Sequence, residues 1–192
     1  MKVLILNGFD YDTPEQSVEL ALMELLRDNG YHFVNVKLAD KNIKPCKGCF
    51  NCWVKTPGEC IIKDDSQEIC KIIINSDLVV ILTPVVFGGY SGTMKKMIDK
   101  IIPLILPFFG KYFSETHHIP RYDKYPCILG IGILKENLID ESLCFQKIVL
   151  RNSLNFHSPL SFAKAFQSNE EGVVVKNSLR DILYQIEKYY AE

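Results

Sequence analysis

The sequence lacks three features that would each place it in a large class of proteins. Its formal net charge is -1 over 192 residues, so it has no basic surface of the kind that binds nucleic acid. No apolar run reaches the roughly 20 residues that a membrane span needs, because Pro103 and Pro107 interrupt the longest one, residues 101–109. The N-terminal run, residues 1–8, is too short for a signal peptide. We therefore expect a cytoplasmic protein that binds neither nucleic acid nor a membrane.

Common catalytic motifs are missing as well. The chain has no Gly-x-x-x-x-Gly-Lys segment for a nucleotide phosphate and no His-Glu-x-x-His segment for zinc. Gly130 and Gly132 lack the third glycine of a dinucleotide-binding fingerprint, and Thr93 replaces the last glycine of a nucleophile elbow. The seven cysteines cannot all pair with one another. In a reducing compartment, a cluster of them indicates metal or redox chemistry.

What the sequence does contain is an alternation of apolar runs and amphipathic segments. The runs are mostly β-branched and unalternating, which is typical of parallel strands buried on both faces. We predict strands at residues 2–7, 31–38, 77–82, 126–134 and 160–166. We predict helices at residues 13–29, from 65 onward with Asp65 as its cap, and at 92–102, 140–151 and 173–190. This order predicts one α/β domain, residues 1–192, built on a doubly wound parallel sheet.

Residues 83–96, which follow the third predicted strand, carry the clearest functional signal. Pro84 is predicted to end that strand. Gly88 and Gly89 permit backbone conformations closed to other residues and let a flat ligand approach closely. Ser91 can cap the helix that follows. A strand that ends in such a loop and re-enters a helix makes a crevice at the carboxyl edge of the sheet, where open α/β folds bind ligands.

The segment Thr-Pro-Val-x-Phe-Gly-Gly-x-Ser-Gly-x-Met-Lys-x-x-Ile-Asp-Lys resembles the flavin-ring loop of the NAD(P)H-dependent FMN reductases, which have a flavodoxin-like fold. The resemblance implies a five-stranded parallel sheet in the order 2-1-3-4-5, with FMN at its carboxyl edge. It also implies that the cofactor is bound by Thr83, Pro84, Val85, Val86, Phe87, Gly88, Gly89 and Ser91. The family usually has tyrosine at the position of Val86, so Phe87 alone would stack on the ring.

The same resemblance places the FMN phosphate in the loop after the first strand, at a helix N-terminus with free backbone N–H groups. It assigns Asn7, Thr13 and Ser17 to cofactor binding there. The loop departs from the family pattern, because Asp10 and Asp12 supply two acids and no base. Carboxylates repel a phosphate unless they point outward.

A cysteine-rich loop follows the second predicted strand. Cys46, Cys49 and Cys52 are spaced by two residues, and Cys60 comes after a Pro-Gly turn, so four thiols can converge. Four thiolates commonly hold an iron-sulfur cluster. The spacing is similar to that of the iron-sulfur flavoproteins, which share this fold, and implies a 4Fe-4S cluster facing the flavin edge of its own or a neighbouring subunit. A structural zinc ion and plain thiols are the alternatives, since many reductases resemble this loop without being cluster proteins.

The segment 103–125 is aromatic, broken by prolines and too long for an ordinary connection, which indicates a lid or an oligomer contact. His117, His118 and Arg121 lie within it. Arg121 is the cation placed to meet an anionic substrate or a nicotinamide phosphate, and a subunit interface is an equal alternative.

Three functions are compatible with these residues. The first is an FMN-dependent oxidoreductase that passes electrons from NAD(P)H to a quinone, a nitro compound, a flavin or a metal ion, with the flavin carrying the chemistry. The second is an iron-sulfur flavoprotein that acts as an electron carrier. The third is a scaffold without a cofactor that senses redox state or zinc through its cysteine loop. The resemblance also implies a homodimer or a higher homo-oligomer.

Overall fold

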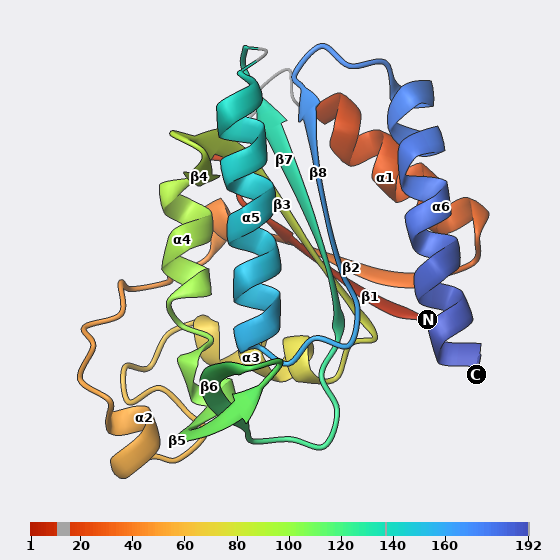
Figure 1. The fold of residues 1–192 in the computed structure, drawn as a ribbon. Coiled ribbons are helices and arrows are strands. Elements are labelled where there is room, and N and C mark those ends of the chain that lie inside the picture. Colours follow the sequence, from red (N-terminus) through yellow and green to blue (C-terminus); the bar gives the residue numbers. More distant parts are fainter. Residues whose placement is uncertain (11–15, 137, 192) are drawn as a thin grey trace.

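The computed structural model describes residues 1–10, 16–136 and 138–191, and its centre is a parallel β-sheet (Figure 1). The strands follow the order β2-β1-β3-β7-β8. Their bounds are β1 (Lys2–Asn7), β2 (His32–Lys37), β3 (Leu78–Val86), β7 (Cys127–Leu134) and β8 (Ser161–Gln167). These are the five predicted strands in the flavodoxin-like order, so the predicted fold class is confirmed.

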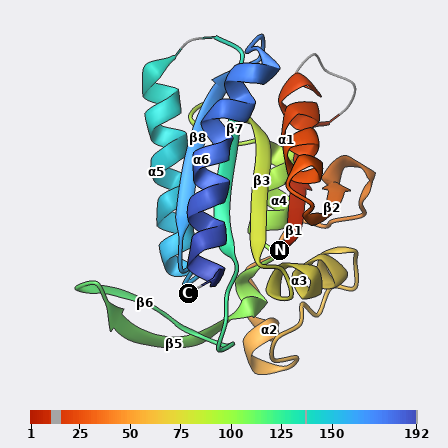
Figure 2. The same cartoon turned by 90° about the vertical axis from the view of Figure 1, so that its right-hand side faces the viewer.

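Helices cover both faces of the sheet (Figures 1 and 2). One face is covered by α1 (Gln16–Asp28) and α6 (Gly172–Ala191), and the other by α3 (Ser66–Ile74), α4 (Gly92–Ile98) and α5 (Ile139–Asn155). Ile5 and Val80 pack toward the first layer, whereas their neighbours Leu4 and Val79 pack toward the second. Burial on both faces explains why these strands are apolar at every position. Within the described ranges, no helix is long and apolar enough to cross a membrane.

The prediction that Pro84 ends the third strand was wrong. Pro84 pairs with Ile133 of β7, and β3 continues to Val86 before it turns back as β4 (Gly89–Tyr90). The two residues at the turn, Phe87 and Gly88, have φ values of 48° and 72°. A two-residue hairpin turn of this kind needs positive φ at both positions. The predicted ring loop is therefore the tip of a tight β-hairpin.

The segment 103–125 forms its own structure at one end of the molecule. A 3-10 turn, η2 (Ile102–Leu104), leads into a second sheet of two antiparallel strands, β5 (Ile105–Tyr112) and β6 (Glu115–Pro120). Figure 2 shows this hairpin projecting from the body of the domain. It carries the exposed side chains Phe108, Phe109 and Phe113. That the segment serves as a lid or an oligomer contact stays a prediction.

The cysteine loop contains two short helical turns, η1 (Leu38–Asp40) and α2 (Asn51–Val54). Figures 1 and 2 place α2 beside the β5–β6 hairpin, at the end of the molecule opposite the loop between β7 and α5. All seven cysteines are free thiols.

Candidate functional site

The hairpin tip after β3 is fixed to the end of β1 by buried hydroxyl groups. Thr83 Oγ1 accepts a hydrogen bond from the Ser91 backbone N–H at 3.1 Å. Ser91 Oγ accepts from the Met94 backbone N–H at 3.2 Å and donates to the Gly8 carbonyl at 2.8 Å. Ser91 is thus the predicted cap of α4. Both hydroxyls are used in holding the loop, which makes Thr83 and Ser91 supports of the site.

The tip itself presents apolar surface. Phe87 is 94% exposed and Val86 is 47% exposed, whereas Val85 is buried. Gly88 has no room for a side chain, because a Cβ atom there would lie 2.8 Å from Cys144 Cβ. A Cβ atom on Gly89 would meet nothing nearer than 3.5 Å. A flat ligand can therefore contact Phe87 and Val86, while Gly88 lets the tip lie against α5.

The phosphate loop is described only in part, since Thr13 and Asp12 lie outside the described residues. Asn7 is buried, and its Oδ1 accepts from the Phe9 backbone N–H at 3.1 Å, so it shapes the turn after β1. The buried Ser17 Oγ, in the first turn of α1, has no hydrogen-bond partner among the described residues. Buried hydroxyls are normally paired, so this atom is free to bind a ligand.

One acid of this loop has a partner. Thr93 Oγ1 donates a hydrogen bond to the Asp10 carboxylate. Thr93 lies in the first turn of α4, and the favourable end of that helix dipole faces the acid. Asp10 is thus engaged with α4, and together with the orphaned Ser17 hydroxyl this fits an FMN phosphate at the N-terminus of α1.

The cysteine loop lies beside the β5–β6 hairpin and not at the carboxyl edge of the sheet, where it was expected. Residues 41–50 run away from β2 (Figure 1). Trp53 anchors α2 to η2 and the start of β5, because its Nε1 donates to the Ile102 and Ile105 carbonyls at 3.2 and 2.9 Å. The expectation that the loop faces the flavin edge of its own subunit was wrong for this reason. That the loop faces the flavin edge of a neighbouring subunit stays a prediction.

The four predicted cysteines nevertheless line one hollow. A hollow of about 20 Å³ is lined by Cys46, Cys49, Cys52 and Cys60. Four cysteine thiols are a suitable donor set for a cluster or for zinc. The hollow has room for about one water molecule, so the loop must rearrange to enclose a cluster. Within residues 1–10, 16–136 and 138–191, no three His, Cys, Asp or Glu side chains converge closely enough to hold a metal ion.

The protonation of Cys52 reflects this crowding. Burial raises the pKa of its thiol, and the nearby Cys60 and Cys46 raise it further. Thiol ligands must lose their protons when they bind a metal. The Cys52 thiol is therefore harder to deprotonate in the absence of a metal ion than a solvent-exposed thiol is.

Sequence reasoning missed a buried ion pair that closes the hollow. Lys100 is 1% exposed, and its Nζ lies 3.0 Å from Oδ2 of Asp64, whose side chain is 0% exposed. Lys100 Nζ also donates to Cys60 Sγ at 3.3 Å. Asp65 occupies the predicted N-cap position of α3 but makes no side-chain capping bond. Asp64 accepts the Ser66 backbone N–H instead. A lysine just after an amphipathic helix normally predicts a solvent-exposed side chain, so no sequence signal pointed to Lys100.

Both members of the pair are charged near neutral pH. Burial lowers the pKa of Lys100, but hydrogen bonds with Asp64 and Cys60 outweigh this effect and raise it. Burial raises the pKa of Asp64, but hydrogen bonds from Ser66 and Lys100 outweigh that effect and lower it. A fixed ammonium group therefore adjoins one of the four thiols.

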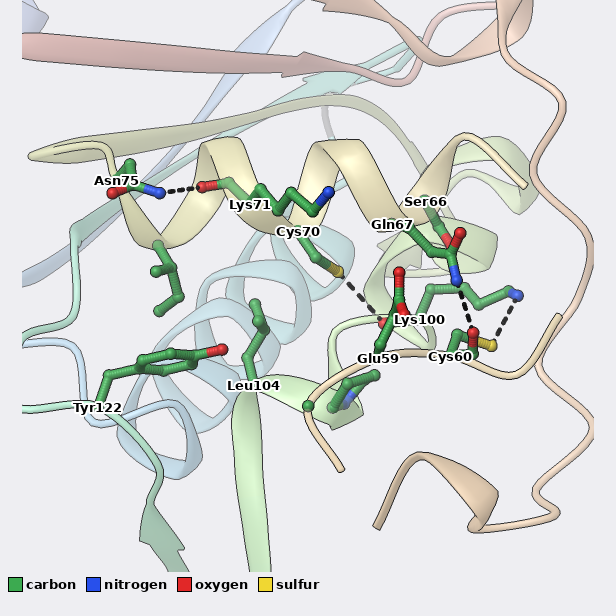
Figure 3. A pocket seen from close by; sticks show the side chains of 13 residues that line it. Glu59, Cys60, Ser66, Gln67, Cys70, Lys71, Asn75, Lys100, Leu104 and Tyr122 are labelled. Carbon is green, nitrogen blue, oxygen red and sulfur yellow. Dashed lines mark hydrogen bonds between the residues drawn. The ribbon is translucent and has the colours of Figure 1, made fainter. Parts of the chain in front are cut away.

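A larger cavity of about 290 Å³ lies on the other side of this pair, between α3 and the segment that joins α4 to β5 (Figure 3). Cys60 and Lys100 line both cavities. Gln67 Nε2 donates to the Cys60 carbonyl at 2.7 Å. Cys70 donates to the Lys100 carbonyl at 3.5 Å, and burial raises the pKa of its thiol to about 12. Cys70 is thus a protonated core residue.

The residues singled out in the hairpin make structural contacts. His117 Nε2 lies 2.9 Å from Glu115 Oε2, and His118 Nδ1 lies 2.8 Å from the Leu106 carbonyl. Arg121 Nε donates to the Pro103 carbonyl at 2.8 Å. These bonds hold the strands and their flanking segments together. They bring none of the three side chains to the flavin loop.

Comparison with known proteins identifies the family of the chain. Residues 1–114 match the family described as NADPH-dependent FMN reductase. An iron-sulfur flavoprotein of Methanocaldococcus jannaschii is 36% identical over 111 residues, which are 56% of this chain and 55% of that protein. One of Archaeoglobus fulgidus is 34% identical over 104 residues, 52% of this chain and 48% of that protein. The chain spans about half the length of these relatives.

Solved structures resemble almost the whole chain. An NAD(P)H:quinone oxidoreductase from Methanothermobacter marburgensis superposes with a TM-score of 0.69 at 12% identity, over 95% of this chain and 96% of that chain. An FMN-dependent NADH-azoreductase from Bacillus anthracis, in complex with FMN, has a TM-score of 0.62 at 14% identity over 98% of each chain. At these identities, the likeness concerns the fold.

Proposed function

The chain belongs to the NADPH-dependent FMN reductase family, and we propose that it is an FMN-dependent oxidoreductase. It passes electrons from NADH or NADPH to a small acceptor such as a quinone, a nitro compound, a flavin or a metal ion. The observation that carries the proposal is the tip of the β3–β4 hairpin, which holds the exposed Phe87 and Val86 at the edge where flavodoxin-like folds bind ligands.

The residues divide into those that contact the cofactor and those that hold the loops. Phe87 and Val86 lie against the flavin ring, and the backbone of Pro84, Gly88 and Gly89 lines it. The Ser17 hydroxyl, which has no hydrogen-bond partner among the described residues, binds the phosphate together with Thr13. The buried set Asn7, Thr83, Val85 and Ser91 keeps both loops in place.

The bound flavin supplies the hydride chemistry, accepting electrons from the nicotinamide. The protein's part is to bind and orient the ring and to expose one of its faces. In this assignment, no side chain of the hairpin tip has to take up or release a proton, because the tip is apolar. Quinones and azo compounds are among the acceptors to test, because two structural relatives are named a quinone oxidoreductase and an azoreductase.

The test is a steady-state assay of protein loaded with FMN, with NADH and NADPH as donors and a panel of quinones, nitroaromatics, azo dyes, free flavins and ferric chelates as acceptors. We expect turnover with at least one donor and one acceptor, and loss of turnover when FMN is removed. Absence of FMN uptake together with absence of turnover would contradict the proposal.

A second candidate function rests on the cysteine loop. Four cysteines line one hollow, and two relatives of the chain are named iron-sulfur flavoproteins. The same protein would then hold a 4Fe-4S cluster on Cys46, Cys49, Cys52 and Cys60, and would act as an electron carrier.

Iron, zinc and acid-labile sulfide should be measured after anaerobic purification. We expect Cys49→Ser to remove iron, whereas Cys144→Ser, a change at an exposed cysteine of α5, leaves it in place. Zinc without iron, in a colourless protein that takes up no FMN, would instead support the redox or zinc-sensing scaffold.

We also infer a homodimer or a higher homo-oligomer. Phe108, Phe109 and Phe113 are 64%, 63% and 85% exposed on one projecting hairpin, and aromatic side chains are enriched in protein interfaces. Sedimentation equilibrium tests the inference, and a monomer at all concentrations would contradict it. Seven unpaired cysteines are also typical of a protein that functions in the reducing cytoplasm.

A further inference from the structure

Lys100 is a buried cation that the flavin site does not use. It follows the last turn of α4 at the end of the domain where the cysteine loop lies. Figure 3 shows the side chains of Lys100 and Cys60 directed toward each other at the edge of the larger cavity. A lysine is almost never fully buried unless it is paired, so this position needs an explanation.

The ammonium group is held from one side by a carboxylate that is itself fixed. Asp64 Oδ2 lies 3.0 Å from Lys100 Nζ and also accepts the Lys44 backbone N–H at 3.0 Å. Asp64 Oδ1 accepts the Ser66 backbone N–H at 3.0 Å. These bonds tie the carboxylate to the cysteine loop and to the start of α3. Lys100 therefore points in one direction, and Cys60 Sγ is the remaining partner found for it, at 3.3 Å.

Cys60 is the thiol that most needs such a partner. Cys46, Cys49 and Cys52 are placed by one short segment, whereas Cys60 is eight residues further along the chain. Its backbone is held by Gln67, which donates to the Cys60 carbonyl at 2.7 Å. A hydrogen bond from a charged donor to the sulfur then fixes the side chain, and such bonds are stronger than neutral ones.

We propose that Lys100 is the positioning residue of the four-cysteine centre: anchored on Asp64, it orients Cys60 toward the other three thiols and places a fixed positive charge beside them. The inference rests on the proposed cluster function. The charge offsets part of the repulsion among thiolates that share one hollow. It also favours the reduced form of a bound cluster, because each added electron increases the negative charge next to the ammonium group.

The test compares Lys100→Met with Lys47→Met after anaerobic reconstitution with iron and sulfide. Lys47 lies in the same loop and is exposed, so its removal deletes a charge screened by water and no bond to sulfur. We expect Lys100→Met to lose iron to a chelator about tenfold faster than wild type, and its cluster to have a more negative reduction potential. Lys47→Met should change both quantities little.

Removing Lys100 alone leaves Asp64 buried without its cation, which can unfold the domain. The double variant Asp64→Asn, Lys100→Met removes both charges and keeps an oxygen for the Ser66 N–H. It should fold, as judged by circular dichroism and FMN uptake, and should also lose iron faster than wild type. Its potential should shift in the same direction as in Lys100→Met but by less, because the negative charge of Asp64 is removed as well. A double variant that holds its cluster as wild type does, at an unchanged potential, would refute the role of Lys100.

The outcomes separate this inference from the function on which it rests. If wild-type protein binds no iron after reconstitution, both the cluster function and the positioning role are wrong. If wild-type protein binds a full cluster and the Lys100 variants match it in iron retention and potential, only the positioning role is wrong. Equal effects of Lys47→Met and Lys100→Met would likewise refute it, since a screened charge would then suffice.

Discussion

Replacement of Phe87 by alanine tests the flavin-ring assignment most directly. Phe87 forms the tip of the β3–β4 hairpin, where its side chain is 94% exposed and its φ is 48°. A side chain this exposed contributes little to folding, since it stays in water in the absence of a ligand. Phe87→Ala should therefore leave the thermal midpoint of the FMN-free protein close to the wild-type value.

The effect on FMN binding should be large. A phenylalanine side chain has about 150–250 Å² of surface, and a flavin ring stacked on one face covers about half of it. Burial of about 100 Å² contributes about 2.5 kcal/mol at 25 cal/mol per Å². Because alanine retains a small part of this contact, we expect a loss of about 2 kcal/mol, which raises Kd for FMN about 30-fold.

The assay is a titration of FMN fluorescence, with thermal stability measured in parallel at fixed FMN. The matched control is Phe113→Ala. Phe113 is 85% exposed with a φ of 51°, like Phe87, but it lies at the turn of the β5–β6 hairpin. The control should bind FMN as wild type does. An unchanged Kd in Phe87→Ala, or an equal loss in both variants, would show that the ring does not lie against the β3–β4 tip.

Three further changes test other parts of the structure. Ser17→Ala should weaken FMN binding about tenfold, by loss of one hydrogen bond to the charged phosphate, yet leave the affinity for riboflavin, which has no phosphate, unchanged in the same titration. Gly130→Ala places a Cβ atom 2.6 Å from Val149 Cγ2 and should lower the free energy of unfolding by about 1–3 kcal/mol in urea denaturation, with recovery when Val149→Ala is added. The pKa of Glu115 is lowered from 4.5 to about 2, first by its hydrogen bonds with Arg151. The stabilisation from this ionised carboxylate is present above pH 4.5 and is lost as the pH falls toward 2, so Glu115→Gln should flatten the stability profile in that window, and an unaltered profile would contradict this assignment.

The fold was predictable from the sequence because buried parallel strands have a pattern that few other elements share. Residues 78–82 are apolar at every position, and the structure buries them on both faces of the sheet. The strand order required the resemblance to flavodoxin-like reductases, since pairing between strands leaves no mark on the spacing of residues within them. The sequence did not predict the hairpin at residues 83–90, because a proline such as Pro84 usually ends a strand. A proline can stay in a strand where its missing N–H is not needed.

The candidate sites were predictable only in part, for reasons that lie in tertiary structure. The four cysteines of the metal prediction do line one hollow, because their spacing confines them to one loop. The direction of that loop depends on Trp53, whose indole bonds to carbonyls about fifty residues away, and no local pattern encodes such a contact. Lys100 and Asp64 are likewise 36 residues apart in sequence, from 64 to 100. Each alone predicts an ordinary surface charge.

The position of the two candidate sites bears on how they could work together. The proposed flavin-binding residues lie where α4 begins, and the cysteine hollow is lined by residues just beyond the end of α4. Within one chain, α4 and the sheet therefore separate the two sites. Electron transfer between them inside a single subunit would have to cross the domain, whereas an assembly can place the cysteine loop of one chain at the flavin edge of another. Phe109 of the β5–β6 hairpin packs on His118, which also contacts Trp53 of α2, so an interface formed there would bury the cysteine loop against a neighbour. The oligomeric state is thus tied to the choice between the two proposed functions: a reductase needs only the flavin edge, whereas an electron carrier with this geometry needs a second subunit.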